Sequence, residues 1–365
     1  MPLYDESSER LDALRFPLIV GIVFLHAYGS TVSLEGGRVA GVAAAGPAVD
    51  FIREFVSQGL ARTAVPAFFL ISGYLFFADV SWSPRTYTDK LKRRTRSLLV
   101  PMVIWNLAVL GLLAVAQTSP LLRGYFSGAN SPIAEYTAWQ YLRAVFGIGQ
   151  MPIAYQFWFI RDLMVLAVLT PLVWLGVRYA RWPVLAILAG CWVFDIWPLF
   201  APSSEATLFF VAGAAIAVGR ASLFYLDRWG AFIAAVYAVL LVADTLLTGS
   251  PVHHYLHKGE IVAGVAAVLF ATGCVVLHPG LKRVLLGLSG AAFFVFAAHE
   301  PALTIVRKMT YKVLAPSSPL MLLALYLLLP TLVIAALLLV WILLARFAPR
   351  FVGIVTGSRS GKGLA

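Results

Sequence analysis

Apolar runs of about 20 residues recur along almost the whole chain, and they constrain its fold more than any other feature. A helix rises about 1.5 Å per residue, so such a run matches a hydrocarbon core about 30 Å thick. The runs are continuous and do not alternate between polar and apolar residues, which favours helices over the strands of a membrane barrel. Hydrophobic residues make up 61% of the sequence and charged residues only 12%, which excludes an ordinary soluble domain.

The sequence therefore predicts an all-α polytopic membrane protein, a bundle of about ten transmembrane helices. The expected spans cover residues 16–34, 60–79, 98–117, 157–177, 182–199, 206–219, 230–248, 260–277, 284–306 and 320–345. Together they form one transmembrane domain over 1–345, and 346–365, rich in Gly, Ser and basic residues, is an expected disordered tail. The longest break between spans contains AEYTAWQYLRAVFG, which predicts an amphipathic helix at the membrane interface.

The net charge of +11 comes from basic residues placed in the loops between apolar runs. This placement indicates topology and not a nucleic-acid partner, so the partner we expect around the protein is membrane lipid. Most of the 28 lysine and arginine residues fall in alternate loops, on the side that holds both termini. We expect that side, and hence both termini, to be cytoplasmic.

The stretch RFPLIVGIVFLHAYG places one histidine, His26, within the first apolar run. If Arg15 lies at the cytosolic boundary, helical geometry puts His26 about 16 Å deeper, near the middle of the membrane. An ionisable group at that depth is costly and commonly marks a functional site. The alternative is a neutral imidazole packed in the bundle and hydrogen-bonded to a backbone carbonyl.

The run TDKLKRRTRSLLVP, residues 88–101, carries a cluster of basic residues at the cytosolic edge of the third span. Arg93 and Arg96 are three residues apart, so on a helix they share a face and can grip a phosphate together. Loops that only set topology look similar, and this interpretation stays open.

Two segments near the outer side carry polar residues as well. In ARTAVPAFFLISGYLFF, Ser72 and Gly73 allow a helix or a ligand to approach the backbone closely, and Arg62 opens the span. In QFWFIRDLMVLAVLTPLVW, Asp162 follows Arg161 where the chain re-enters the membrane. Packing, a local ion pair and an aromatic belt explain these residues; Arg62, Ser72 and Asp162 are also candidates for binding an acceptor.

Titratable residues recur in two later places. His299 and Glu300 are neighbours beyond the midplane of the ninth span, where two such groups are costly, so we expect a functional role in substrate binding. His253, His254 and His257 stand in PVHHYLHKG, with a spacing that zinc ligands can adopt. No further ligand is near them in the sequence, so a solvated loop is expected and no metal site.

Five of these segments, in this order, resemble the motifs of the membrane acyltransferase 3 family of bacterial integral-membrane acyltransferases. Arg15 and His26 resemble its R-x10-H motif, and VPAFFLISGYL resembles its F-F-x-x-S-G signature. KRRTRSLLVP resembles its R-x-x-R followed by proline. WFIRDL and the S-x-x-x-F-x-x-x-x-x-H-x-P pattern from Ser289 to Pro301 resemble its later motifs. The resemblance covers essentially the whole chain.

The resemblance implies a transferase in the bacterial plasma membrane that moves an acyl group, usually acetyl from acetyl-CoA, to a hydroxyl of an extracytoplasmic glycan. It implies that His26 is catalytic with Arg15 as its partner, and that Arg93 and Arg96 contact coenzyme A, a co-substrate and not a permanently bound cofactor. Two departures stand out: Phe16 and Pro17 follow Arg15, and no fused hydrolase-like domain follows the bundle. The bundle is thus expected to complete the transfer alone.

The chemistry of the residues agrees with this implication, because a phosphate-rich donor needs a basic cytosolic mouth and an imidazole can take a hydroxyl proton. It leaves open whether His26 acts as a base or carries the acyl group itself. A transporter or flippase for a lipid-linked or small polar solute is the alternative. That function would place charged residues in both vestibules, and no internal repeat supports it.

Overall fold

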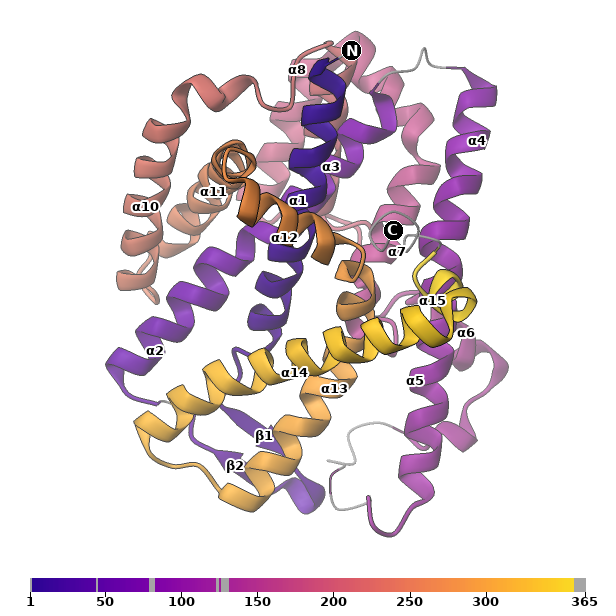
Figure 1. Cartoon of the computed structure of the whole chain (residues 1–365), viewed down its shortest axis with the longest axis vertical. Coiled ribbons are helices and arrows are strands. Elements are labelled where there is room, and N and C mark those ends of the chain that lie inside the picture. Colours follow the sequence, from indigo (N-terminus) through magenta and orange to yellow (C-terminus); the bar gives the residue numbers. More distant parts are fainter. Residues whose placement is uncertain (1, 44, 79–82, 123–124, 126–130, 358–365) are drawn as a thin grey trace.

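The computed structural model describes residues 2–43, 45–78, 83–122, 125 and 131–357 (Figure 1). Nearly all of its regular structure is helical. The α-helices are α1 (Pro2–His26), α2 (Pro47–Arg53), α3 (Ala64–Phe77), α4 (Pro84–Arg94), α5 (Val100–Thr118), α6 (Ala138–Phe146), α7 (Trp158–Val168), α8 (Thr170–Val193), α9 (Ser204–Val218), α10 (Gly230–Leu246), α11 (His253–Val276), α12 (Pro279–Ser289), α13 (Ala292–Leu314), α14 (Pro319–Phe347) and α15 (Pro349–Val355). The strands are β1 (Thr31–Ser33) and β2 (Val39–Gly41), and the other helical turns are η1 (Glu35–Gly37), η2 (Glu54–Gly59), η3 (Leu60–Thr63), η4 (Thr95–Leu99), η6 (Ile133–Glu135), η7 (Tyr155–Phe157) and η8 (Tyr225–Trp229).

Six helical stretches in the described residues are long and apolar enough to cross a membrane. They are 47–77, 84–118, α8, 225–246, α11 and α14. A seventh results if α12 and α13, which meet at an angle of 65°, are taken as one broken span. All ten expected apolar runs fall largely in helices, but the count of ten transmembrane helices is not confirmed. The structure has fewer candidate spans than the ten expected for three reasons. The first half of α1 is charged, α9 is short, and a break separates α7 from α8.

The first helix ends earlier than the expected span 16–34. α1 continues through Pro17 and ends at His26, and the chain then forms the hairpin of β1 and β2. The turn residues after His26 include Gly29 and Ser30, and Gly41 in β2 has a φ of +91°, which suits glycine. His26 therefore lies at a helix end beside an irregular segment, and not inside a longer helix.

α1 packs along the middle of the bundle, between α13, α11 and α3 (Figure 1). Arg10 connects the first half of α1 to its neighbours. Its guanidinium forms an ion pair with Asp227 at 2.6 Å and donates to the Thr272 hydroxyl and the Leu269 carbonyl. The same group lies 3.6 Å from the centre of the Phe224 ring. These contacts position the helix that carries Arg15 and His26.

Two predictions outside the spans can be compared with the structure. The amphipathic segment forms α6, with a capping box between Thr137 and Gln140 at its start and left-handed Gly147 at its end, so the predicted helix is confirmed. In the predicted tail, α14 continues to Phe347 and α15 follows, with Val352 and Val355 buried against the bundle. Residues 358–365 lie outside the described residues.

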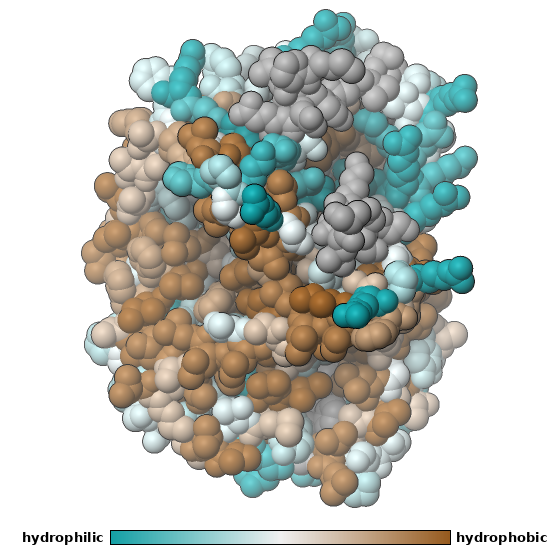
Figure 2. Space-filling view, in the orientation of Figure 1, coloured by the Kyte–Doolittle hydropathy of each residue, from teal (hydrophilic) through white to brown (hydrophobic). Residues whose placement is uncertain are grey.

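Hydrophobic residues form a broad band across the face shown in Figure 2, with hydrophilic residues above and below it. The hydrophilic end at the top is the one that holds the start of α1 and the basic helix α4 (Figure 1). The hairpin of β1 and β2 lies at the opposite end. This banding fits a multi-pass membrane protein.

Candidate active site

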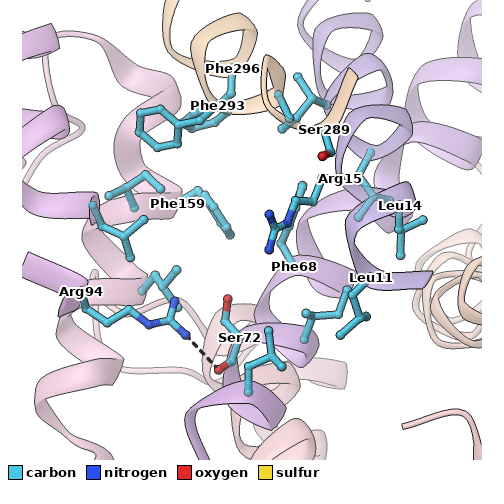
Figure 3. Close-up of a pocket in the computed structure, with 18 residues that line it drawn as sticks. Leu11, Leu14, Arg15, Phe68, Ser72, Arg94, Phe159, Ser289, Phe293 and Phe296 are labelled. Carbon is cyan, nitrogen blue, oxygen red and sulfur yellow. Dashed lines mark hydrogen bonds between the residues drawn. The ribbon is translucent and has the colours of Figure 1, made fainter. Parts of the chain in front are cut away.

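A cavity of about 230 Å³ lies where α1, α3, α7 and the α12–α13 pair meet near α4. Four polar residues line it: Arg15, Ser72, Arg94 and Ser289. The guanidinium groups of Arg15 and Arg94 reach into it from different sides (Figure 3). The remaining lining is apolar and includes the rings of Phe68, Phe159, Phe293 and Phe296. Such a cavity can hold an extended apolar or amphipathic group with an anion near the two arginines.

The small residues of the second motif have a structural explanation. A Cβ on Gly73 would lie 1.9 Å from the carbonyl oxygen of Phe210, and a Cβ on Gly213 would lie 1.9 Å from that of Leu70. α3 and α9 therefore pack backbone against backbone, as the small residues predicted. This contact fixes the face of α3 that turns Ser72 toward the cavity.

The arginine that enters the cavity from the basic run is Arg94, not Arg93 or Arg96. Arg94 is half-buried, and its Nη2 donates to the Ser72 carbonyl at 3.4 Å, the dashed line in Figure 3. Arg93 and Arg96 are both exposed. The helix changes from α to π winding at Thr95, directly after Arg94, so the three-residue spacing does not place Arg93 and Arg96 on one α-helical face.

Arg15 lies on the same helix as His26, as the R-x10-H spacing requires. Its side chain is 48% exposed and forms an ion pair with Asp12 at 3.0 Å. The guanidinium can therefore turn toward a ligand without leaving a buried group unpaired. Arg15 lines the cavity, whereas His26 lies about seven residues beyond Ile19, the deepest residue of α1 in the lining, which is roughly 10 Å of helix.

Deeper in the bundle, His26 belongs to a cluster with Tyr155, His299 and Glu300. The Tyr155 hydroxyl lies 2.8 Å from Nδ1 of His26 and donates to Oε1 of Glu300. The rings of His26 and His299 are 5.2 Å apart between centroids. His299 is fully buried and Glu300 is nearly so, whereas His26 is half-buried. The structure thus brings His26 together with His299 and Glu300, which the sequence singled out in a different span.

The hydrogen bonds of this cluster assign its protons. Because Tyr155 donates to Glu300, its oxygen accepts from Nδ1–H of His26, and Nε2 of His26 then carries a free lone pair. Nδ1 of His299 lies 2.6 Å from the Phe296 carbonyl and donates to it, so its Nε2 also carries a lone pair. That Nε2 is buried and has no hydrogen-bond partner among the described residues. Burial raises the pKa of the Tyr155 phenol, as does nearby Glu300, and this keeps it a donor.

Two further residues of α13 complete the surroundings of the cluster. Thr304 donates to Oε2 of Glu300 at 3.0 Å. Arg307 Nη1 lies 3.4 Å from the His26 carbonyl, and its Nε is buried without a hydrogen-bond partner in the part of the chain that the structure describes. An unpartnered buried donor beside an imidazole is suited to an oxygen that develops negative charge.

A layer of aromatic rings separates the cavity from this cluster. Phe296 lines the cavity, and its ring centroid is 6.1 Å from that of His299 on the other side. Phe159 and Phe157 pack against Phe296 at 6.0 Å and 5.5 Å between centroids. A group that enters at Arg94 therefore meets these rings before it reaches His26.

Two predicted acceptor-binding residues lie elsewhere in ion pairs. Asp162 is fully buried, pairs with Arg161 at 2.8 Å and accepts from the Ser203 backbone amide at 2.8 Å, which orders the start of α9. Arg62 pairs with Glu205 at 3.4 Å. Neither Arg62 nor Asp162 lines the cavity. The contacts of Asp162 are thus a local ion pair and a helix-capping hydrogen bond.

Three residues of the site were not singled out from the sequence: Arg94, Tyr155 and Arg307. Arg94 stands in the basic run, but nothing in that run distinguishes it from Arg93; its place in the cavity lining and its hydrogen bond to the Ser72 carbonyl show that it faces inward. Tyr155 comes from the loop before α7, where no spacing connects it to His26. Arg307 is two helical turns beyond Glu300, and this periodicity is the signal that could have found it.

The fold and the site together define a multi-pass membrane protein with a cation-lined cavity and a paired-imidazole cluster behind it. Residues 8–346 match the family model described as an acyltransferase domain, the acyltransferase 3 family. The chain is also 29% identical to the succinoglycan biosynthesis protein ExoH of Rhizobium meliloti (strain 1021), over 97% of this chain and 93% of that protein. No solved structure matches it significantly.

The chain therefore belongs to the acyltransferase 3 family, as its motifs predicted, and is a membrane acyltransferase. This membership decides between the two functions left open by the residues, in favour of the enzyme and against the transporter. Membership of the family assigns no role to any single residue, so the role of each residue is inferred from the geometry of the site.

Proposed function

We propose that the protein transfers an acyl group, acetyl in the simplest case, from cytosolic acyl-CoA to a hydroxyl of an extracytoplasmic glycan. The observation that carries the proposal is the cluster of His26, Tyr155 and Glu300, placed behind a cavity that two arginines enter. The bacterial plasma membrane is the proposed location. The donor is a co-substrate that enters and leaves at each turnover, and no resident cofactor is required.

The donor is proposed to enter at the end of the bundle that carries α4. The phosphates of coenzyme A need cationic donors, and Arg15 and Arg94 supply them inside the cavity. Arg93 and Arg96 are exposed on the same basic helix, where they attract the anion at longer range. The apolar lining between Arg94 and Phe296 suits the narrow pantetheine arm of coenzyme A, which carries the thioester.

The acceptor is proposed to approach from the end of the bundle that holds the hairpin of β1 and β2, near His26 and Arg307. The similarity to a protein of succinoglycan biosynthesis supports a glycan as the acceptor class. A sugar hydroxyl at this place can donate its hydrogen bond to Nε2 of His26 or of His299. The exposure of His26 exceeds that of His299, which makes His26 the residue that meets the acceptor.

In the proposed reaction, Nε2 of His26 takes the proton of the acceptor hydroxyl as its oxygen attacks the thioester carbonyl. The Tyr155 oxygen accepts from Nδ1–H of the ring, and Glu300, which accepts from the Tyr155 hydroxyl, helps to stabilise the imidazolium that forms. Arg307 stabilises the oxyanion through its unpartnered Nε. The carbon–sulfur bond then breaks, and the coenzyme A thiolate takes the proton from His26, so that an ester and free coenzyme A leave the site.

The proposal can be tested in cells by mass spectrometry of surface glycans. Strains that lack the gene are compared with strains that carry the wild-type protein, His26→Gln or the control His278→Gln, which changes an exposed histidine. We expect the glycan from the deletion and His26→Gln strains to lack the mass of one acetyl group per modified sugar, with His278→Gln like the wild type. A different mass would name another acyl donor, and identical glycans in all four strains would refute the proposal.

A further inference from the structure

A second cluster of titratable residues lies on α10 and α11, apart from the site described above. Asp244 comes from the end of α10, and His253, His257 and Glu260 come from the first turns of α11. Nδ1 of His257 is 2.9 Å from Oδ2 of Asp244, and Nδ1 of His253 is 3.0 Å from Oδ1 of the same carboxylate. The sequence predicted a solvated loop here, but the structure places these histidines in a helix.

Three residues of this cluster offer ligand atoms that lie near one another, and His253 stands beside the same Asp244 carboxylate. One atom each from Asp244, His257 and Glu260 lie within 4.8 Å of one another. The histidines are four residues apart, and Glu260 follows three residues after His257, so all three project from one face of α11. The additional ligands therefore come from Glu260, on the next turn of α11, and from Asp244, on the neighbouring helix α10.

The carboxylates of the cluster are buried without enough positive charge around them. Glu260 is fully buried, and neither of its oxygens has a hydrogen-bond partner of normal geometry among the described residues. Asp244 is 2% exposed, and its Oδ1 likewise accepts no hydrogen bond of normal geometry among those residues, although Nδ1 of His253 lies 3.0 Å away. Tyr237 and Arg62 are the other polar groups that act on Glu260, and Arg62 is shared with Glu205. Two buried carboxylates with so few partners are costly unless a cation joins them.

We propose that Asp244, His257 and Glu260, with His253 as the fourth ligand, bind a zinc ion. Two carboxylates neutralise a divalent cation, and the mixed nitrogen and oxygen donors favour zinc over calcium or magnesium, which prefer oxygen alone. Ligand atoms about 2.0–2.2 Å from a tetrahedral zinc lie roughly 3.4 Å apart. Nδ1 of His257 is 2.9 Å from Oδ2 of Asp244 and 3.9 Å from Oε2 of Glu260, one on each side of that value, and the ligand atoms of the three residues lie within 4.8 Å of one another.

Four protein ligands leave no open position, which is the arrangement of a structural zinc site and not of a catalytic one. The ion would hold the end of α10 to the start of α11. The short helix η3, which carries Arg62, contacts both α1 and α11 and so connects this region to the packing around α1. The proposal does not depend on the proposed acyl transfer.

The test uses the full-length protein, purified in detergent through a tag without histidines from cells grown with zinc. Metal content is measured by mass spectrometry for the wild type, His257→Gln, Glu260→Gln and the control His278→Gln. We expect one zinc per chain in the wild type and the control, and a loss of at least tenfold in the two variants. Equal zinc in all four proteins, or another metal in the wild type, would overturn the proposal.

A second measurement needs no variant, so it remains informative if the substitutions prevent folding. The wild-type protein is stripped with a chelator, and Co²⁺ or Zn²⁺ is added back. We expect Co²⁺ to give the strong visible absorption of tetrahedral coordination, and Zn²⁺ to raise the melting temperature by several degrees. A weak octahedral Co²⁺ spectrum together with an unchanged melting temperature would overturn the assignment.

Discussion

Arg94 and Arg93 are adjacent arginines of the same chemistry, and the structure predicts that only one of them binds the donor tightly. Arg94 lines the cavity and reaches the Ser72 carbonyl, whereas Arg93 is exposed. A hydrogen bond to a charged group contributes about 1.5–3 kcal/mol, so Arg94→Gln should raise the KM for acyl-CoA roughly 10- to 150-fold. An exposed ion pair contributes at most about 1 kcal/mol, so Arg93→Gln should raise it less than about fivefold.

The assay is acyl transfer by the purified protein in nanodiscs, with acyl-CoA varied at a fixed concentration of acceptor. Arg94→Lys serves as a further control because it keeps the charge but loses the forked donors, and we expect it to fall between wild type and Arg94→Gln. Melting temperatures show whether loss of the bond to Ser72 affects folding instead. A larger effect on KM from Arg93→Gln than from Arg94→Gln would refute the placement of the donor in this cavity.

Three further outcomes follow from the geometry. Tyr155→Phe removes the hydroxyl that joins Nδ1–H of His26 to Glu300, so it should lower kcat about 10²-fold with little change in KM. A wild-type kcat in this variant would show that Tyr155 has no part in the mechanism. Because burial raises the pKa of Tyr155, wild-type activity should not fall as the pH approaches about 10, the ordinary tyrosine value, and a fall that Tyr155→Phe abolishes would contradict this. Gly73→Ala would place a Cβ 1.9 Å from the Phe210 carbonyl and should destabilise the bundle by about 1–3 kcal/mol, seen as a lower melting temperature; an unchanged value would contradict the close packing of α3 on α9.

Much of the fold could be predicted because hydrophobic runs report directly on helices in a membrane. Each expected apolar run falls largely in a helix, and the segment predicted as an amphipathic helix forms α6. The number of spans could not be predicted in the same way. The helix break at Leu169 leaves no gap in hydrophobicity, because the residues on both sides of it stay apolar, whereas the kink at Ala180 falls in the gap predicted between spans 157–177 and 182–199.

The site was predictable where its residues share a helix. His26 and Arg15 lie on α1, and His299 and Glu300 lie on α13, so spacing alone placed each pair. That His26 meets His299 depends on how α1 packs against α13, which no local pattern encodes. The choice of Arg94 over Arg93 depends on how α4 packs beside the cavity, and the place of Tyr155 depends on the path of the segment before α7.

The central claim is that His26, held by Tyr155 and Glu300, takes the acceptor proton during acyl transfer from acyl-CoA. The most direct test is a single-turnover reaction of purified protein with isotope-labelled acyl-CoA, run with and without an oligosaccharide acceptor. We expect labelled oligosaccharide only when acceptor is present, no label on the protein without it, and at least a 10²-fold slower transfer by His26→Gln. Label bound to His26 in the absence of acceptor, or transfer by His26→Gln at the wild-type rate, would contradict it.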